Sequence, residues 1–284
     1  MDNENLIHIR DIHFPLNEVE QRDWYDGDPI KTTFCDALSV FFPVGERFFI
    51  KSVKHFSDRI DDPDFKEEVR RFCIQEALHT REHEAYNAHL ASYGYDIEKM
   101  EGRVKRALNS MKVPMFQLAL TVGIEHLTAC LSHIVLNDPK VLEKAHPVYR
   151  RLWTWHALEE MEHKGVAFDV FKLATAHFPG WKRYLLRVFA MLVVTVYLHK
   201  ILLNNFADML RFRGHSLGLG TWSKLAVVLF VNPGIYRRGF LHYLSFYLPF
   251  FHPWKGDDGS LTQKGRECLA QLMKDEESNV SSRV

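Results

Sequence analysis

Two Glu-x-x-His pairs are the residues of this chain best suited to metal chemistry. They are Glu76 with His79 and Glu160 with His163. Residues three apart on a helix share a face, so each pair can present a carboxylate and an imidazole to one ion. In helical bundles that hold two metal ions, two helices each supply such a pair, and the other two each supply one Glu.

The Glu-x-x-His pattern is weak evidence on its own. With 16 histidines and 19 glutamates in 284 residues, about one match is expected by chance. A third match, Glu143 with His146, stands directly before Pro147, and we assign it to chance. A metal site therefore needs support from other residues.

Two single glutamates in apolar surroundings give that support. Glu125 lies in LALTVGIEHLTACL and Glu46 lies in SVFFPVGERFFI. A buried carboxylate without a partner costs several kcal/mol unless it is protonated. The helix expected around Glu125 has no basic residue to pair with it, whereas Glu46 has Arg47 and Lys51 as alternative partners. A divalent ion shared with other ligands removes the cost.

The order of these residues along the chain favours one common site. Successive expected helices carry a single Glu, a Glu-x-x-His pair, a single Glu and a second pair. Carboxylates and imidazoles without thiolate suit two divalent ions, with Fe as the expected metal and Mn or Zn as alternatives. The predicted metal ligands are Glu46, Glu76, His79, Glu125, Glu160 and His163.

Two further histidines, His83 and His156, lie one helical turn from His79 and Glu160. We predict that they are catalytic, with direct ligation and ordinary helix-face polarity as the alternatives. A metal-binding histidine usually donates its second ring nitrogen to another group. Candidates for such contacts are Asp36, Glu82, His126, Glu159 and Asp169.

Prolines mark where the helices are expected to begin. Asp62 can cap a helix that has Pro63 at its first position, and Pro114, Pro147 and Pro179 mark further starts. The predicted helices cover about 34–55, 63–93, 97–111, 114–136 and 147–177, the first bent near Pro43. No sustained period-two alternation occurs, so we predict an all-α, four-helix bundle with one crossover.

The chain divides by composition into four segments. We predict an N-terminal extension (1–33), the bundle (34–178), an apolar helical region (179–254) and a polar tail (255–284) that frays. The apolar run 188–198 is shorter than the roughly 20 residues that span a bilayer. It is either a buried core helix or a helix that faces a membrane or a partner.

Charge and cysteine content exclude several classes of protein. Lys+Arg and Asp+Glu are equal at 36 each, so nothing favours nucleic acid as a partner. The four cysteines form no CxxC pair, which argues against zinc-ribbon and thioredoxin chemistry. The first residues are polar and do not form a secretory signal, so we expect a cytoplasmic protein with reduced cysteines.

Five sequence blocks carry a resemblance to a known family. They are GDPIKTTFCDALSVFFPVGERFF, QEALHTREHEAYN, ALTVGIEHLTA, WHALEEMEHKGVAFDVF and YLPFFHPW. In these blocks the chain resembles the bacterial "predicted metal-dependent hydrolase" family, a ferritin-like group. The resemblance implies a ferritin-like fold, metal ligands at the six predicted positions, and roles for His83 and His156.

Three functions fit these observations. A di-metal site can activate O₂ to oxidise an apolar small molecule, or it can generate hydroxide for hydrolysis. The third is metal binding without catalysis. The apolar region allows peripheral membrane contact through residues 184–251, and a homodimer is a further alternative.

Overall fold

Helices make up the regular structure of the chain. The computed structural model describes residues 7–255 and 259–281, and no strand occurs in these ranges beyond a single bridge between Tyr25 and Ala145. The all-α prediction is therefore confirmed. The helices are α1 (Pro29–Ser39), α2 (Phe42–Lys54), α3 (Pro63–Ser92), α4 (Ile97–Ser110), α5 (Pro114–Asn137), α6 (Pro147–His163), α7 (Val166–Ala174), α8 (Gly180–Phe212), α9 (Leu219–Phe230), α10 (Ile235–Ser245) and α11 (Ser260–Ser281).

Capping at prolines places the helix starts. The Asp62 side chain accepts hydrogen bonds from the backbone N–H groups of Asp64 and Phe65, so α3 begins at Pro63 as predicted. The starts at Pro114 and Pro147 are also confirmed. His146 accepts from the Val148 N–H as the cap of α6, which explains its position without a metal.

Two predicted helices are each two helices in the structure. The predicted span 34–55 is α1, which already begins at Pro29, followed by α2; the chain bends between them beside Pro43. The predicted span 147–177 is α6 and α7, interrupted at Gly165. A Cβ atom on Gly165 would lie 2.3 Å from the indole nitrogen of Trp254, so a distant residue packs at this break.

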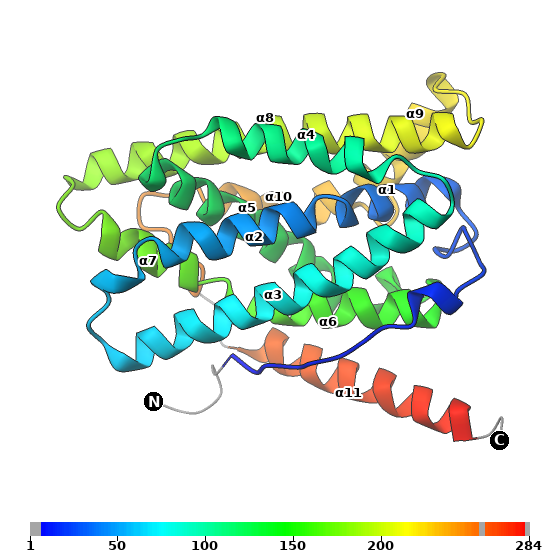
Figure 1. Cartoon of the computed structure of the whole chain (residues 1–284), viewed down its shortest axis with the longest axis horizontal. Coiled ribbons are helices and arrows are strands. Elements are labelled where there is room, and N and C mark those ends of the chain that lie inside the picture. The colour runs from blue at the N-terminus through cyan, green and yellow to red at the C-terminus, as the bar shows by residue number, and fades with distance from the viewer. Residues whose placement is uncertain (1–6, 256–258, 282–284) are drawn as a thin grey trace.

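Four long elements, α2, α3, α5 and α6, lie alongside one another, and α4 crosses between the ends of α3 and α5 (Figure 1). α2 packs chiefly against α3, and α5 packs against α6. α8 runs along α5 on the other side. α5 is consequently the central helix, with the bundle on one face and α8 and α10 on another.

α5 and α8 are both long and apolar enough to cross a membrane, judged by length and composition alone, among the described residues. The two helices differ in burial. In an apolar stretch of 18 residues, 72% of the stretch is buried in α5 but only 33% is buried in α8. The run 188–198 is therefore not a fully buried core helix. Met191 and Val194 are buried, whereas Phe189 and Val196 are exposed.

The prediction that the C-terminal residues fray is wrong for α11. This helix packs along α6, where Leu261 and Leu269 are buried. Arg266 forms an ion pair with Glu162 at 3.0 Å, and Glu276 forms one with Arg151. The polar composition hid a helix with one apolar side.

Replacement of Gly165 tests the contact that separates α6 from α7. We expect Gly165→Ala to lower the free energy of unfolding by about 1–3 kcal/mol, because the added methyl group collides with Trp254. In a Trp254→Ala background the same substitution should cost much less. Gly180→Ala is the control, since nothing lies within 4 Å of its Cβ position. Urea unfolding of the wild type and the four variants measures these costs, and equal costs of Gly165→Ala in both backgrounds would contradict the contact.

Candidate metal centre

The predicted ligands meet in the interior between four helices. α2 supplies Glu46, α3 supplies Glu76 and His79, α5 supplies Glu125, and α6 supplies Glu160 and His163. Each of these side chains is at most 2% exposed. The chain therefore gathers four carboxylates and two imidazoles in a space that is shielded from solvent.

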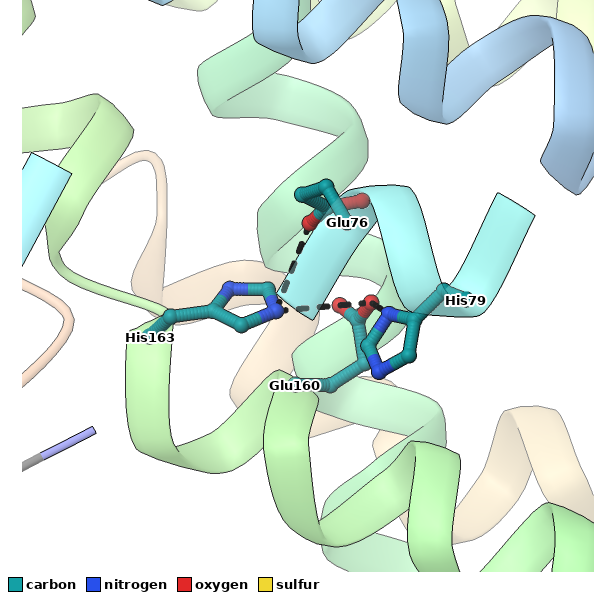
Figure 2. A group of neighbouring side chains, drawn as sticks. All are labelled: Glu76, His79, Glu160 and His163. Atoms are coloured by element: carbon teal, nitrogen blue, oxygen red, sulfur yellow. Dashed lines mark ion pairs between the residues drawn. The ribbon is translucent and has the colours of Figure 1, made fainter. Parts of the chain in front are cut away.

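One group of ligand atoms comes from the two Glu-x-x-His pairs. Glu76, His79, Glu160 and His163 can each offer an atom within 4.8 Å of the others. Figure 2 shows the side chains from α3 and α6 pointing toward one another. His163 Nε2 lies 3.3 Å from Glu76 Oε1 and 3.9 Å from Glu160 Oε1. His163 Nδ1 lies 3.2 Å from Glu125 Oε2, which joins α5 to the group.

A second group consists of Glu46, His79 and His156. His156 Nε2 lies 3.2 Å from Glu160 Oε1, and its ring stacks on that of His79 with centroids 4.3 Å apart. The structure therefore places His156 among the ligand atoms. His156 is therefore a candidate seventh ligand, which corresponds to the alternative of direct ligation given in the sequence analysis.

Unsatisfied polar atoms provide a test of whether these residues fit a metal. Among the described residues, nine atoms of this site are buried without a hydrogen-bond partner. Each such atom costs about 1–3 kcal/mol. They all lie within the two groups or on Glu125, so bound cations would satisfy them together. The atoms are both carboxylate oxygens of Glu46 and Glu76, Glu125 Oε1, Glu160 Oε1, His79 Nδ1, His156 Nε2 and His163 Nε2.

The carboxyl groups of the site also perturb one another. Burial and then the neighbouring carboxylates raise the pKa of Glu76 well above its ordinary value, and burial does the same to Glu46. Burial raises the pKa of Glu125 to about 7. A divalent ion relieves both the burial cost and the repulsion between carboxylates.

Histidines compensate part of this charge. Burial pushes the pKa of Glu160 upward, but His163 and His156 hold it below its ordinary value. Burial alone would lower the pKa of His163, yet Glu125 and Glu160 raise it to about 9. Burial keeps the pKa of His79 well below its ordinary value, so this imidazole is neutral and suited to ligation.

A second layer of residues orients the ligands. His79 Nε2 lies 3.1 Å from Glu159 Oε2, which leaves His79 Nδ1 toward the site. Glu159 in turn accepts from Arg10 at 3.2 Å. Thr128 donates its hydroxyl hydrogen to Glu160 Oε2. Of the contact residues suggested by the sequence, only Glu159 fills that role.

The other suggested residues make their contacts elsewhere. Asp36 accepts from Tyr86, Glu82 accepts from the Phe14 N–H, and Asp169 pairs with His252. His126 lies 2.9 Å from the carbonyl oxygen of His242. Sequence analysis did not identify Arg10 or Thr128. Thr128, one turn after Glu125, could have been found from its spacing, whereas Arg10 carries no local signal.

His83 lies behind His156 rather than among the ligand atoms. Ser39 Oγ donates to Asn87 Oδ1 at 3.0 Å, so it must accept from His83 Nδ1 at 2.9 Å. His83 Nε2 then accepts from His156 Nδ1, 2.8 Å away. This chain of hydrogen bonds leaves the lone pair of His156 on Nε2, which faces Glu46 and His79. His83 is thus a positioning residue for His156.

Replacement of Glu46 separates a metal ligand from a structural glutamate. Both of its oxygens lack partners, so we expect Glu46→Leu to stabilise the metal-free protein by about 1–4 kcal/mol. The same variant should lose most of the gain in melting temperature that Mn(II) gives to the wild type. Calorimetry with and without Mn(II) measures both effects.

Glu162→Leu is the matched control, because this buried glutamate of α6 pairs with Arg10 and Arg266. It should destabilise the metal-free protein by about 1–3 kcal/mol, since Arg10 and Arg266 both lose the charged hydrogen-bond acceptor that they share. A loss of stability in Glu46→Leu, with an unchanged response to Mn(II), would contradict the assignment of Glu46.

Replacement of His83 tests its positioning role. We expect His83→Leu to lower the affinity for one Mn(II) ion by about 10–100-fold while the other ion still binds, because His156 loses the bond that fixes its tautomer. Isothermal titration calorimetry measures the two affinities. His89→Leu, on the same helix but bonded to Tyr93, should leave both unchanged. Equal titration curves for wild type and His83→Leu would rule the role out.

Comparison with known proteins gives one match. A family model described as "predicted metal-dependent hydrolase" matches residues 8–257. No curated protein and no solved structure matches the chain. The matched range includes every residue of the two ligand groups and ends before α11.

Proposed function

The chain belongs to the predicted metal-dependent hydrolase family, and we propose that it is a ferritin-like enzyme that uses two divalent ions, in particular iron, to activate O₂. The observation that carries this proposal is the set of nine buried, unpartnered atoms between α2, α3, α5 and α6. The six predicted ligands, with His156 as a seventh, would hold the two ions. The substrate would be an apolar small molecule.

The donor set supports iron or manganese. The two groups contain glutamates and histidines and no cysteine. Hard carboxylates with borderline imidazoles favour Fe(II) and Mn(II) over metals that require thiolate. Two such ions, when bound, would supply the one-electron redox chemistry that O₂ requires and that amino-acid side chains lack.

Burial favours oxidation over hydrolysis. The ligands are almost fully inaccessible, and Phe42, Phe72 and Trp155 pack edgewise or tilted against the rings of His156, His163 and His79. Such an aromatic lining disfavours water, which hydrolysis needs as a reactant, and is compatible with a small apolar gas. The chain's own contribution is to hold the ligands rigidly and to keep the site dry.

A cavity next to the site is the candidate substrate pocket. It has a volume of about 390 Å³ and lies between α5, α6, α10 and α11. Ala129 and Lys164 in its wall are one turn beyond Glu125 and Glu160, and Met161 is adjacent to Glu160. Phe250, Phe251 and Leu261 add apolar surface, and His126 and His242 add polar groups, which suits a small molecule with an apolar body and a polar end.

Hydrolysis is the second candidate, because the family description names it. The hydrogen-bonded pair His156–His83 could then hold a proton beside the metals. Metal binding without catalysis is the third candidate, and the adjacent cavity argues against it.

Iron loading in the absence of O₂ tests the proposal. We expect two Fe(II) per chain to bind, followed by O₂ consumption and new visible absorption when air is admitted. Glu125→Ala should reduce the rate of O₂ consumption and the new absorption by at least about tenfold, since it removes the ligand that α5 supplies. An oxygen electrode and a spectrophotometer provide the measurements.

Glu98→Ala, on the exposed side of α4, is the control and should behave like the wild type. Tight binding of Zn(II) with hydrolysis of an ester, and without O₂ consumption by the iron form, would favour the second candidate. Failure to bind any of these metals would contradict the site itself.

A further inference from the structure

One side of the molecule exposes apolar side chains over three consecutive helices. On α8 they recur every three or four positions and so form a single stripe, each residue being at least half exposed. This stripe consists of Trp181, Leu185, Phe189, Leu192 and Val196. α10 and the residues after it add Phe240, Leu241, Leu244, Leu248 and Phe250, and α9 with its C-terminal end adds Leu219, Val227, Phe230 and Val231. We call these residues together the apolar face.

The parts of the apolar face adjoin because α8 and α10 are antiparallel neighbours and Phe230 at the end of α9 packs against Tyr236 of α10. Tyr184 OH donates to the Tyr247 carbonyl at 3.0 Å, and Thr195 Oγ1 lies 3.1 Å from Tyr243 OH. His199 packs its ring against Tyr236 further along. Residue numbers therefore rise on one helix as they fall on the other. Soluble monomers seldom expose a connected apolar surface of this kind, so it indicates a binding surface.

Positive charge is concentrated in the same segment. Residues 180–252 contain nine Lys and Arg and a single Asp, although the whole chain is balanced at 36 of each sign. Arg187 is buried, and Arg211, Arg213 and Arg238 pair with Asp208, Asp23 and Asp138, so the remaining cations give this surface its positive charge. Lys182, Lys200 and Lys224 are exposed on α8 and α9. An apolar surface that carries cationic residues matches an anionic lipid bilayer, whose surface attracts each Lys or Arg by about 1 kcal/mol.

An apolar cavity of about 530 Å³ opens in this face. Phe230 and Phe240 line it and are each more than half exposed, so its mouth lies among the residues of the apolar face. Its inner wall is made by Leu131 and Ile134 of α5. A cavity of this size and lining can admit an acyl chain.

α8 packs against the rest of the fold along one side and is exposed along the other. Its length and composition would allow it to cross a membrane, but its buried side packs on α5 and α1. Met191 and Val194 on that side lie against Gly123 of α5. A helix held in this way presents one face to its surroundings, which is the geometry of a helix in the plane of a membrane interface.

From this geometry we propose that the apolar face docks on an anionic lipid bilayer. α8 and α10 lie in the plane of the interface, their apolar side chains enter the acyl region, and the cavity opens toward it. This inference does not depend on the reaction at the metal centre. It also gives the predicted membrane contact through residues 184–251 a defined surface.

Co-sedimentation with lipid vesicles tests the docking. We expect the full chain to bind vesicles of phosphatidylcholine mixed with phosphatidylglycerol more tightly than vesicles of phosphatidylcholine alone. The double variant Phe189→Glu, Leu241→Glu should lower the partition coefficient at least about tenfold, because it removes two apolar side chains from the membrane. Lys200→Gln should lower it about fivefold on the mixed vesicles only.

Ile9→Glu is the matched control. Ile9 is 40% exposed, but its segment lies beside Glu162 and α11, away from α8 (Figure 1). It should bind vesicles like the wild type, and circular dichroism should show that all variants keep their helical content.

Three results would overturn the proposal. One is the absence of wild-type binding to both vesicles, another is equal binding of the wild type to both, and the third is unchanged binding by the double variant. A different result would assign the apolar face to contact between two copies of the chain. In that case the wild type would not bind vesicles, light scattering would show that it is a dimer, and the double variant would be a monomer.

Discussion

Buried carboxylates that lie close together repel one another, and the rest of the fold has to balance this repulsion. A layer of glutamates crosses the interior at the level of the metal centre, and it includes Glu159 and Glu162 as well as the candidate ligands. The chain neutralises the outer part of this layer with Arg10 and Arg266. The inner part receives His163 but no arginine or lysine among its described contacts. This division, with arginines outside and only histidines among the inner carboxylates, suits a centre that metals complete.

α5 relates the two main features of the molecule. Its Glu125 joins the ligand groups, while Leu131 and Ile134 line the apolar cavity on another side of the helix. Cys130 borders both this cavity and the smaller one beside the metal centre. One helix therefore separates a buried, charged compartment from an apolar one. Its almost unbroken apolar sequence reflects contacts on nearly every face.

Sequence patterns identified the starts of α3, α5 and α6 and the residues of the candidate centre because both depend on local rules. Proline with a preceding cap fixes a helix start, and a single Glu in an apolar helix stands out regardless of what surrounds it. The interruption at Gly165 could not be foreseen, since the indole that packs there is far along the chain at Trp254. Arg10 and α11 were missed for the same reason: each acts through contacts across the fold. The grouping of His156 with Glu46 depends on how α2 and α6 face each other, which helical spacing does not specify.

The two arginines that meet at Glu162 have a consequence for the assembly of the fold. Arg10 comes from the segment before α1, and Arg266 comes from α11, so segments on either side of the four central helices in sequence close over the same carboxylate. The outer charge layer is therefore complete only when both segments are docked. Separation of α11 from α6 would remove one of these two arginines from Glu162 and leave the acidic layer less balanced.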